Sequence, residues 1–457
     1  ITFNNNEALT LDLNGNGIYL GNNKIFILGA SKNIKITDTS KTDNDYIKSD
    51  SNFTIYNASK LGTITIENTK ILSGGTKPAV YSYEDSKTNI IDSTIQGEKT
   101  VISVLKNSQV NITNSNVKIG NTSGETGIEN TNGKVNITNS KITIIDASTN
   151  GIGIHSNTQN AVTTITNSTV TANKNAISNE KGTLIINSGT FTSNTQHAVR
   201  TTENTTINGG TFISNTMAGL QILGNANNIV INEGIFKTNS NTIGGLAIPQ
   251  EKNIDTYIGK TSTINNKETI TKNGLTFTKE KNITIVSTPK TKSLSTKTYT
   301  YNNKVRTPEV KIINNLGRTL AKDKDYKLNY QQGRKNVGTY YVEITYINDY
   351  KNINKEKLYF TINPKSTNIT SLTKGKKSIT IKIKKQQTQT TGYQIMYSQN
   401  KNFKNSKTTK INNKTTKKTI KNLKAKKKYY AKVRTYKVIN GKTYYSDWSK
   451  VKQVKTK

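Results

Sequence analysis

The strongest chemical signal in this sequence is a group of lysines near its C-terminal end. Lysine side chains are cationic at neutral pH and act together as an electrostatic field rather than as one shaped site. Tyr429 and Tyr430 follow directly, and basic residues beside aromatic ones are typical of surfaces that bind polyanions. We therefore predict polyanion binding by seven lysines: Lys417, Lys418, Lys421, Lys424, Lys426, Lys427 and Lys428.

The net charge of +38 is concentrated around these lysines. Residues 1–289 hold 24 Lys and Arg against 21 Asp and Glu, whereas residues 366–457 hold 26 against one, Asp447. Self-repulsion of this size destabilises a small domain and so favours an anionic partner. We expect an anionic cell-wall polymer or another glycan, and not nucleic acid, as the physiological partner. The alternative is a solvated lysine surface that prevents aggregation.

Residues for covalent or metal chemistry do not form a recognised arrangement. The chain has no cysteine, which excludes disulfides and thiolate metal sites. His155 and His197 belong to different sequence repeats and lack metal-binding spacing, and Arg200 is expected to cap a strand at the surface. We therefore predict no catalytic residue, no cofactor and no metal site.

Acidic side chains provide a second set of candidates. Glycoside hydrolases need two facing carboxylates, and the nearest pairs are Asp43 with Asp45 and Glu84 with Asp85. We expect all four in loops, where their main effect is to solvate the loop. Their alternation could also hold a weakly bound calcium ion at the surface.

These residues are embedded in a repeat that determines the architecture of residues 1–288. Residues 184–194 recur as 206–215 and 230–239, with looser copies at 110–117, 135–142 and 164–170. Each copy has two short β-branched runs around a polar turn, and a third short run recurs between copies. A unit of this length predicts stacked coils, here a right-handed parallel β-helix with three strands per coil. The expected turn residues are Asp38, Asn68, Asp92, Asn114, Asn139, Asn167, Asn187, Asn208 and Asn232.

The stacking of coils leads to further local predictions. We expect the turn Asn residues to adopt left-handed backbone conformations and to hydrogen-bond from coil to coil. Phe191, Phe212 and Phe236 share one offset from their turns, which predicts an internal stack of rings. We expect the first coil near Leu9 and closing strands at residues 274–278 and 282–286.

Two motifs carry a family resemblance for residues 1–288. The segments Leu11-Asp-Leu-Asn-Gly15 and Gly209-Gly-Thr-Phe212 resemble those of adhesin-like surface proteins within the pectin-lyase-like β-helix superfamily. This resemblance implies the fold. It leaves activity open, because the same scaffold supports lyases, hydrolases and adhesins without enzymatic activity.

The remaining residues predict two β-sandwich domains. Residues 289–364, with Asn336-Val-Gly-Thr339 and Phe360-Thr-Ile-Asn-Pro364, resemble a bacterial immunoglobulin-like module of Gram-positive surface proteins. Residues 365–457 resemble a fibronectin type III domain: the spacing from Leu423 to Tyr429 matches its tyrosine corner, and Tyr445-Ser-Asp-Trp-Ser449 matches its last strand. Ile383 is expected in place of that family's usual second-strand tryptophan.

We therefore expect an extracellular protein, secreted or displayed on a bacterial surface, that is adhesin-like and not an enzyme. No apolar stretch is long enough to span a membrane. A chain that starts at Ile1, without a signal peptide, is expected to have been processed or trimmed. Two alternatives remain open. One is a fibre subunit that joins identical subunits through unpaired β edges, and the other is a polysaccharide lyase or hydrolase with accessory modules.

Overall fold

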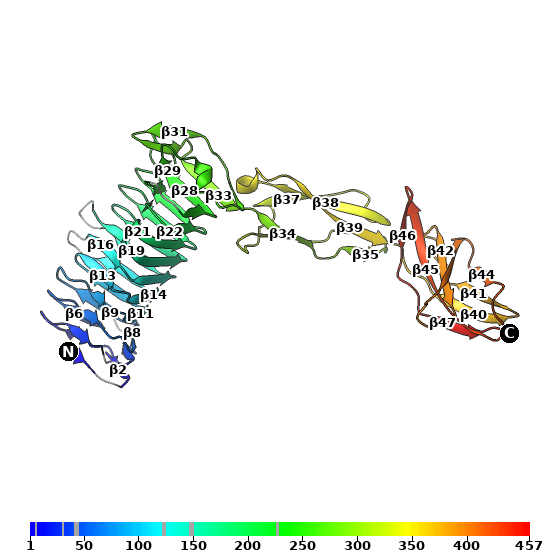
Figure 1. The fold of residues 1–457 in the computed structure, drawn as a ribbon, viewed down its shortest axis with the longest axis horizontal. Helices are drawn as coiled ribbons and strands as arrows, with labels where there is room; N and C mark the ends of the chain where they lie inside the picture. The colour runs from blue at the N-terminus through cyan, green and yellow to red at the C-terminus, as the bar shows by residue number, and fades with distance from the viewer. Residues whose placement is uncertain (5–6, 30–31, 41–44, 121–124, 146–149, 225–227) are drawn as a thin grey trace. The chain divides into compact units, whose positions relative to one another are not determined.

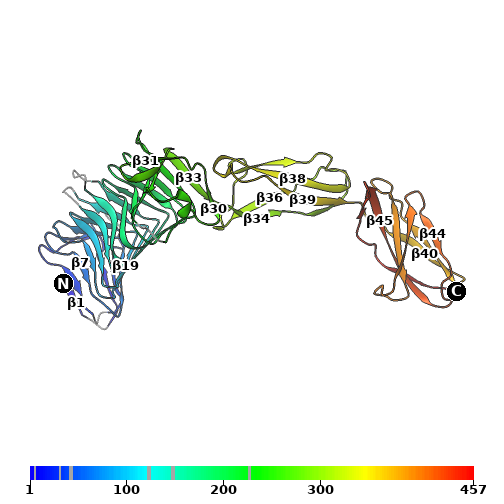
Figure 2. The same ribbon diagram turned by 45° about the horizontal axis from the view of Figure 1, so that its top comes forward.

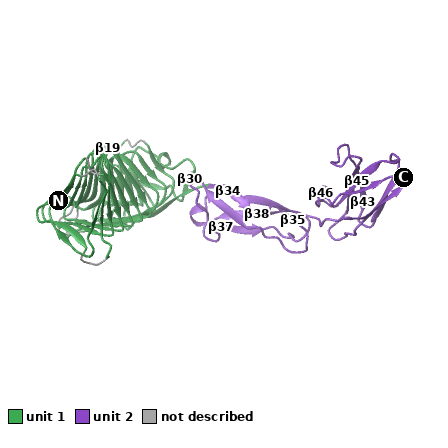
Figure 3. Cartoon of the chain, turned by 90° about the horizontal axis from the view of Figure 1, so that it is seen from below, with its two compact units in different colours: residues 1–288 green, residues 289–457 purple. Residues whose placement is uncertain are grey.

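The computed structural model describes residues 1–4, 7–29, 32–40, 45–120, 125–145, 150–224 and 228–457. The chain forms two compact units, residues 1–288 and 289–457 (Figure 3). The all-β prediction is confirmed, since the elements of these described ranges are strands apart from two short 3-10 helices, η1 (Ile254–Thr256) and η2 (Asn348–Tyr350). Within the described ranges, no helix has the length and apolarity that crossing a membrane requires.

The first unit is a parallel β-solenoid with three strands in each coil, as predicted (Figure 1). Successive coils pair in register, so that Ile90 lies beside Ile112 and Ile112 beside Ile137. Two long strands, β19 (Ile152–Thr166) and β21 (Ile177–Ile186), each pass through two columns. The other strands of the first column are β1 (Thr2–Phe3), β4 (Ile25–Ile27), β7 (Ile55–Asn57), β10 (Val80–Ser82), β13 (Thr100–Leu105), β16 (Thr126–Thr131), β23 (Val199–Thr201), β26 (Leu220–Ile222) and β29 (Leu246–Pro249).

The second and third columns complete each coil. The second contains β2 (Leu9–Asp12), β5 (Ile34–Thr37), β8 (Thr63–Glu67), β11 (Lys87–Ile91), β14 (Gln109–Thr113), β17 (Lys134–Thr138), β24 (Thr205–Ile207) and β27 (Ile229–Ile231). The third contains β3 (Ile18–Tyr19), β6 (Tyr46–Ser49), β9 (Lys70–Ser73), β12 (Thr94–Gly97), β15 (Asn116–Ile119), β18 (Lys141–Ile144), β20 (Ser168–Ala172), β22 (Gly189–Ser193), β25 (Thr211–Ser214) and β28 (Gly234–Thr238).

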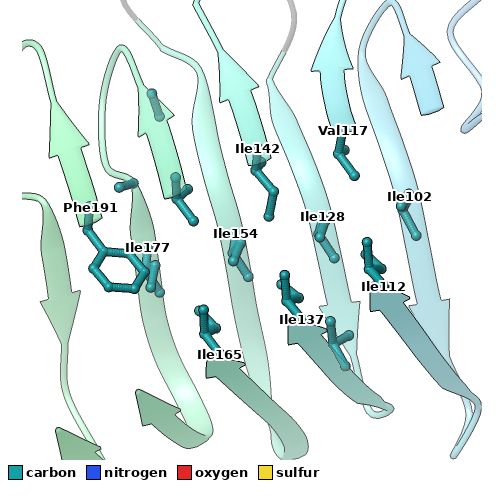
Figure 4. Packing of buried hydrophobic residues seen from close by; sticks show 14 of the residues in the cluster. Ile102, Ile112, Val117, Ile128, Ile137, Ile142, Ile154, Ile165, Ile177 and Phe191 are labelled. Atoms are coloured by element: carbon teal, nitrogen blue, oxygen red, sulfur yellow. The ribbon is translucent and has the colours of Figure 1, made fainter. Parts of the chain in front are cut away.

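The core of this unit is a thin column of mainly β-branched side chains between the three columns of strands. Figure 4 shows Ile112, Ile137 and Ile165 in one row, facing Ile128 and Ile154 from the first column. Each fully buried side chain contributes roughly 1.5–3 kcal/mol. The predicted stack of rings is confirmed, because Phe191, Phe212 and Phe236 are buried with adjacent centroids 5.0 and 4.9 Å apart.

The predicted turn conformation holds for one part of the repeat and is wrong for another. Asn68, Asp92, Asn114, Asn139 and Asn167 have φ between +48° and +51°. Among the described residues with positive φ, however, Asp38, Asn187, Asn208 and Asn232 are absent. In two of those coils a following glycine takes the strained conformation, at Gly189 (φ +140°) and Gly210 (φ +126°), where a side chain is disfavoured.

The predicted hydrogen bonds between turn residues are present even where the backbone prediction fails. The Nδ2 of Asn208 donates to Oδ1 of Asn187 at 3.1 Å, and that of Asn232 donates to Oδ1 of Asn208 at 2.9 Å. Asn167 and Asn139 form the same contact at 2.8 Å. An amide can donate to one coil and accept from the next, so the ladder does not need a left-handed residue.

Both ends of the solenoid differ in detail from the prediction. Residues Thr2–Phe3 already pair with β4, so the first coil begins before Leu9. The closing strands exist as β32 (Leu275–Thr278) and β33 (Asn282–Ser287), but they run antiparallel to β29 and β28. Two further strands, β30 (Ser262–Ile264) and β31 (Thr269–Lys272), pair with them and extend this reversal of direction.

The second unit contains two groups of mainly antiparallel sheets (Figure 2). The buried side chains of Leu294, Val342, Phe360 and Ile362 form a core in the first group. Its strands are β34 (Pro289–Leu294) with β36 (Val310–Asn314), and β35 (Thr298–Thr300), β39 (Glu356–Asn363), β38 (Gly338–Tyr346) and β37 (Tyr326–Tyr330) in that order.

The second group consists of a three-stranded sheet and a five-stranded sheet that face each other. Buried Ile379, Ile381, Tyr393, Ile395 and Val433 fill the space between the two sheets. Ile383 is also buried in this core. The strands are β40 (Ile369–Gly375), β41 (Ser378–Ile383) and β44 (Lys417–Ile420), against β43 (Lys407–Asn412), β42 (Gly392–Ser398), β45 (Lys428–Ile439), β46 (Lys442–Tyr445) and β47 (Lys452–Lys455).

Candidate functional site

The seven predicted lysines lie on β44 and on the loop that leads from it to β45. Lys417 and Lys418 belong to β44, Lys428 begins β45, and the other four lie between these strands. Lys418 is half-buried, while the other six are exposed. In residues 365–457, all of which the structure describes, Asp447 is the single acidic residue and none of the lysines is in a salt bridge.

Backbone hydrogen bonds join this loop to two segments that the prediction did not include. The N–H of Leu423 donates to the carbonyl of Lys377 at 2.9 Å, and the N–H of Lys457 donates to the carbonyl of Gly375 at 2.9 Å. The N–H of Thr456 donates to the carbonyl of Lys427 at 3.0 Å. The β40–β41 turn and the last strand therefore add five lysines to the same end of the domain: Lys374, Lys376, Lys377, Lys455 and Lys457.

A pocket of about 430 Å³ opens beside this loop. It lies between the segment 397–407, at the end of β42, and the segment 422–429. The charged side chains that line it are Lys404, Lys407 and Lys424. The remaining lining residues are Tyr397, Ser398, Gln399, Asn400, Asn405, Asn422, Leu423 and Tyr429, so amide and hydroxyl groups accompany the three cations.

Tyr429 fixes the shape of this pocket. Its hydroxyl accepts the backbone N–H of Lys424 at 3.1 Å and the Nε2–H of Gln399 at 2.6 Å. The first contact is the hydrogen bond that the predicted tyrosine corner requires. Burial also raises the pKa of the neighbouring Tyr397. Tyr397 therefore stays neutral, and the pocket carries cationic charge without a competing phenolate.

We expect Tyr429→Phe to lower the free energy of unfolding by about 1–2 kcal/mol, because it leaves two donors without their acceptor. Chemical denaturation followed by near-UV circular dichroism measures this change. Tyr430→Phe is the matched control, since no hydrogen bond involves its hydroxyl within the fully described residues 365–457. Equal losses for both variants would show that the tyrosine corner does not hold the loop.

Outside the pocket lining, β45 carries cations that lie over aromatic rings. The Arg434 guanidinium lies 3.7 Å from the ring centroid of Tyr445 and 4.4 Å from that of Trp448. The Nζ of Lys432 lies 4.2 Å from the centroid of Phe403, which belongs to the loop beside the pocket. Sequence reasoning missed this arrangement, although Lys432, Arg434 and Tyr436 are alternate residues of the sequence and lie on β45.

His155 meets two carboxylates that were not among the candidates. Its Nδ1 lies 3.0 Å from Oε2 of Glu129, and its Nε2 lies 3.7 Å from Oε1 of Glu180. Arg200 is in the middle of β23 and pairs with Glu180 at 3.3 Å, so the prediction that it caps a strand is wrong. The hydrogen bond with Glu129 raises the pKa of His155. The available signal was the register position that Glu129, His155 and Arg200 share in first-column strands; Glu180 lies two residues beyond it.

The other predicted candidates do not come together. His197 is 3% exposed, and burial lowers its pKa to about 4. Asp45 is buried beside Lys70, so it does not solvate a loop as predicted, and Asp43 lies outside the described residues. Glu84 and Asp85 do follow β10 in a turn, where Glu84 pairs with Lys60 and Lys106. No group of three potential metal ligands occurs in the described part of the chain.

The first column also carries an outward patch of aromatic rings that the sequence analysis missed. Phe26, Tyr56 and Tyr81 occupy one register position in consecutive coils. Tyr56 and Tyr81 have ring centroids 4.9 Å apart, and Lys24 lies 4.7 Å from the Tyr56 centroid. The rings pack against one another along the solenoid, edge to face for Phe26 and Tyr56 and tilted for Tyr56 and Tyr81, and these contacts stabilise the coils.

Comparison with known proteins does not assign this chain to a family. No family model matches the chain, and no curated protein is similar enough to count as a relative. Among solved structures, a crystal structure of chicken CNTN1 FN1-FN3 domains shares 12% sequence identity over 40% of this chain and 81% of that chain. Its TM-score of 0.19 is too low to support an inference about fold or function.

Proposed function

We propose that this chain is an adhesin-like structural and binding protein, secreted or displayed on a bacterial surface. Its pectin-lyase-like β-helix serves as a stiff stalk. An immunoglobulin-like module and a fibronectin type III domain follow the stalk. The basic terminal domain contacts an anionic polymer of the cell envelope or another acidic glycan through the lysine-lined pocket and the lysines around it.

One observation supports this proposal above the others. Lys404, Lys407 and Lys424 line a pocket that contains no acidic side chain, in a domain whose residues 366–457 hold 26 basic residues and one acidic residue. Charge repulsion within such a domain is relieved when a polyanion binds. A dispersed lysine surface that only maintains solubility does not require three cations around one concave site.

Two features support the assignment of the terminal domain to the fibronectin type III family. A three-stranded sheet faces the sheet that contains β42, β43 and β45. The Tyr429 hydroxyl makes the tyrosine-corner contact, and the Oγ of Ser449 accepts the N–H of Val433 at 3.0 Å. Domains of this type commonly serve as spacers and binding modules in extracellular proteins.

We propose that the solenoid acts without catalysis. Glu129 and Glu180 both contact His155 on one face, and they are further engaged by Asn157 and Arg200 respectively. Such an alternation of opposite charges between neighbouring strands stabilises a sheet. A hydrolase needs a carboxyl pair directed toward substrate, so release of reducing or unsaturated sugars from a panel of polysaccharides would contradict this part of the proposal.

The pocket is tested by reversing its charge in the full chain. We expect Lys404→Glu, Lys407→Glu and Lys424→Glu together to weaken binding to an immobilised polyuronate by about tenfold or more, because the cations nearest the polymer become repulsive. The matched control reverses three exposed lysines of the other module, Lys311, Lys327 and Lys351. The control variant has the same net charge as the pocket variant. We expect its affinity for the polyuronate to differ from that of the parent chain by less than about twofold.

Ionic strength provides the second measurement. Affinity should fall steadily as sodium chloride is raised, since exposed charges are screened over about 8 Å at physiological salt. Equal loss of affinity in the pocket and control variants would contradict the pocket as the site. Binding that does not change in high salt would contradict the electrostatic mechanism altogether.

A further inference from the structure

Arginine is rare in this chain, so its positions are informative. The sequence contains five arginines among its 66 basic residues. Three of the five lie over aromatic rings in residues 289–457, namely Arg306, Arg334 and Arg434. A guanidinium is planar and presents five donors in a fixed fork, which lysine cannot reproduce. Its use at these positions therefore points to a requirement for shape as well as charge.

Arg306 and Arg334 are neighbours in space. Arg306 lies on the loop between β35 and β36, and Arg334 lies on the turn between β37 and β38. The backbone N–H of Arg306 donates to the carbonyl of Arg334 at 3.1 Å. Their guanidinium groups lie over Tyr299 and Tyr330, with Cζ to centroid distances of 4.8 and 5.3 Å. The two half-buried arginines are thus joined at the backbone, and each guanidinium lies over a tyrosine ring.

Most donors of the two guanidinium groups lack an acceptor. Arg306 donates from Nη2 to the carbonyl of Thr300 at 3.1 Å, and Arg334 donates from Nη1 to that of Gln331 at 3.2 Å. The Nε atoms of both are buried without a hydrogen-bond partner, and neither arginine is in a salt bridge within residues 289–457, which the structure describes in full. Buried donors of this kind are unusual and call for an acceptor.

Arg434 provides a comparison, because its Nε–H has a hydrogen-bond acceptor within the protein. It also lies over aromatic rings, but its Nε donates to Oε1 of Gln394 at 2.7 Å. Gln394 stands opposite Arg434 on the adjacent strand, so this partner is provided by the sheet itself. Stacking on a ring therefore does not by itself leave a guanidinium without an acceptor, and the arrangement at Arg306 and Arg334 is specific to that pair.

We propose that Arg306 and Arg334 form an oxyanion site for a carboxylate or sulfate group of an acidic glycan. A guanidinium fork matches two oxygens of such a group through parallel hydrogen bonds. Lys304 and Lys335 are exposed beside the two arginines in sequence, while Glu309 is the one acidic residue on the Arg306 loop and is also exposed. This site is separate from the lysine-lined pocket and does not depend on the function proposed for it.

The geometry favours a glycan over nucleic acid. Proteins that bind single-stranded nucleic acid stack bases on open aromatic faces. Here the guanidinium groups lie over the faces of Tyr299 and Tyr330, and the Tyr330 hydroxyl donates to the carbonyl of Pro308 at 2.7 Å. The rings serve to orient the arginines, so recognition falls on an isolated anionic group and not on a base.

The Nε–H resonances of the five arginines test this proposal directly in the full chain. Single Arg→Lys variants assign each resonance in a two-dimensional ¹H–¹⁵N spectrum. During titration with sodium sulfate, and separately with a galacturonate oligomer, we expect saturable shifts of the Arg306 and Arg334 signals. The Arg434 signal should stay in place, because its Nε–H already has an acceptor.

Substitutions then separate shape from charge. We expect Arg306→Lys with Arg334→Lys to weaken oligomer binding at this site about tenfold at unchanged net charge, whereas Arg434→Lys should leave it unchanged. Larger Nε–H shifts with galacturonate than with sulfate would identify a carboxylate as the ligand group. Larger shifts with sulfate than with galacturonate would identify a sulfate ester. The proposal is overturned if chloride at equal ionic strength reproduces the shifts, if neither probe saturates, or if a DNA oligonucleotide binds more tightly than both.

The lysine-lined pocket supplies an independent comparison. The variant with glutamate at positions 404, 407 and 424 should lose polyuronate retention and keep the Arg306 and Arg334 shifts. If those shifts disappear with the pocket, the two arginines are not a separate site. If retention survives in that variant while the shifts remain, the pocket proposal fails and the oxyanion site stands.

Discussion

Phe212→Ala is expected to lower the free energy of unfolding of the solenoid by about 3–5 kcal/mol. Phe212 is fully buried and is the central ring of a stack, 5.0 Å from Phe191 and 4.9 Å from Phe236 with 10° between ring planes. Its loss removes two aromatic pairs, worth about 0.5–1.5 kcal/mol each beyond area burial. It also leaves a cavity. The neighbouring coils cannot move in to fill this cavity, because hydrogen bonds between their strands hold them in place.

Thermal and chemical denaturation of the full chain measure this effect, and hydrogen exchange locates it. Coils contact mainly their neighbours, so exchange should increase first in β22, β25 and β28. Phe212→Leu is the control, because it keeps most of the volume and should cost less than about 1.5 kcal/mol. A loss below about 1 kcal/mol for the alanine variant would mean that the stack is not a stabilising element.

Acid is expected to destabilise the solenoid through His197 by on the order of 3 kcal/mol. Burial lowers the pKa of this imidazole from 6.5 to about 4, and its Nδ1 is 3.0 Å from the carbonyl of Ala218, so it is buried as the neutral form. The unfolded chain therefore binds more protons than the folded chain between pH 6.5 and about 4. The stabilisation is complete above pH 6.5 and is lost progressively as the pH falls to about 4.

His155 should act in the opposite direction. Glu129 raises its pKa, so the folded chain binds the extra proton. Its contribution is complete below pH 6.5 and is lost as the pH rises through the higher folded value. Unfolding curves measured between pH 4 and 8 for His197→Gln and His155→Gln separate the two effects. If His197→Gln retains the full acid sensitivity of the parent chain, another group causes it.

Much of the fold followed from local pattern. Runs such as Val135-Asn-Ile-Thr138 alternate apolar and polar residues, and this alternation fixes which side chains enter a thin core. Phe191, Phe212 and Phe236 share an offset from their turns, so stacking in register brings their rings together. The turn prediction failed at Asn187 and Asn208, because a nearby glycine adopts the strained backbone angle more readily.

The candidate sites were less accessible to sequence reasoning. The lysine cluster was visible because charge accumulates along the chain whatever the fold. Its pocket was not visible, since the segment that carries Lys404 and Lys407 meets Lys424 only after β42 and β45 pair. Asp45 was misjudged for a related reason, because its position in a polar stretch gave no sign that it would be buried beside Lys70.

By itself, the sequence determined the all-β architecture, the three columns of stacked strands, the internal ring stack and the basic character of the terminal domain. Each of these depends on periodicity or composition, which a chain carries before it folds. The tertiary structure alone decided that His155 also meets Glu180, and that Arg306 lies beside Arg334. Those contacts depend on bulges and on loops of irregular length, which the spacing of residue types along the chain does not describe.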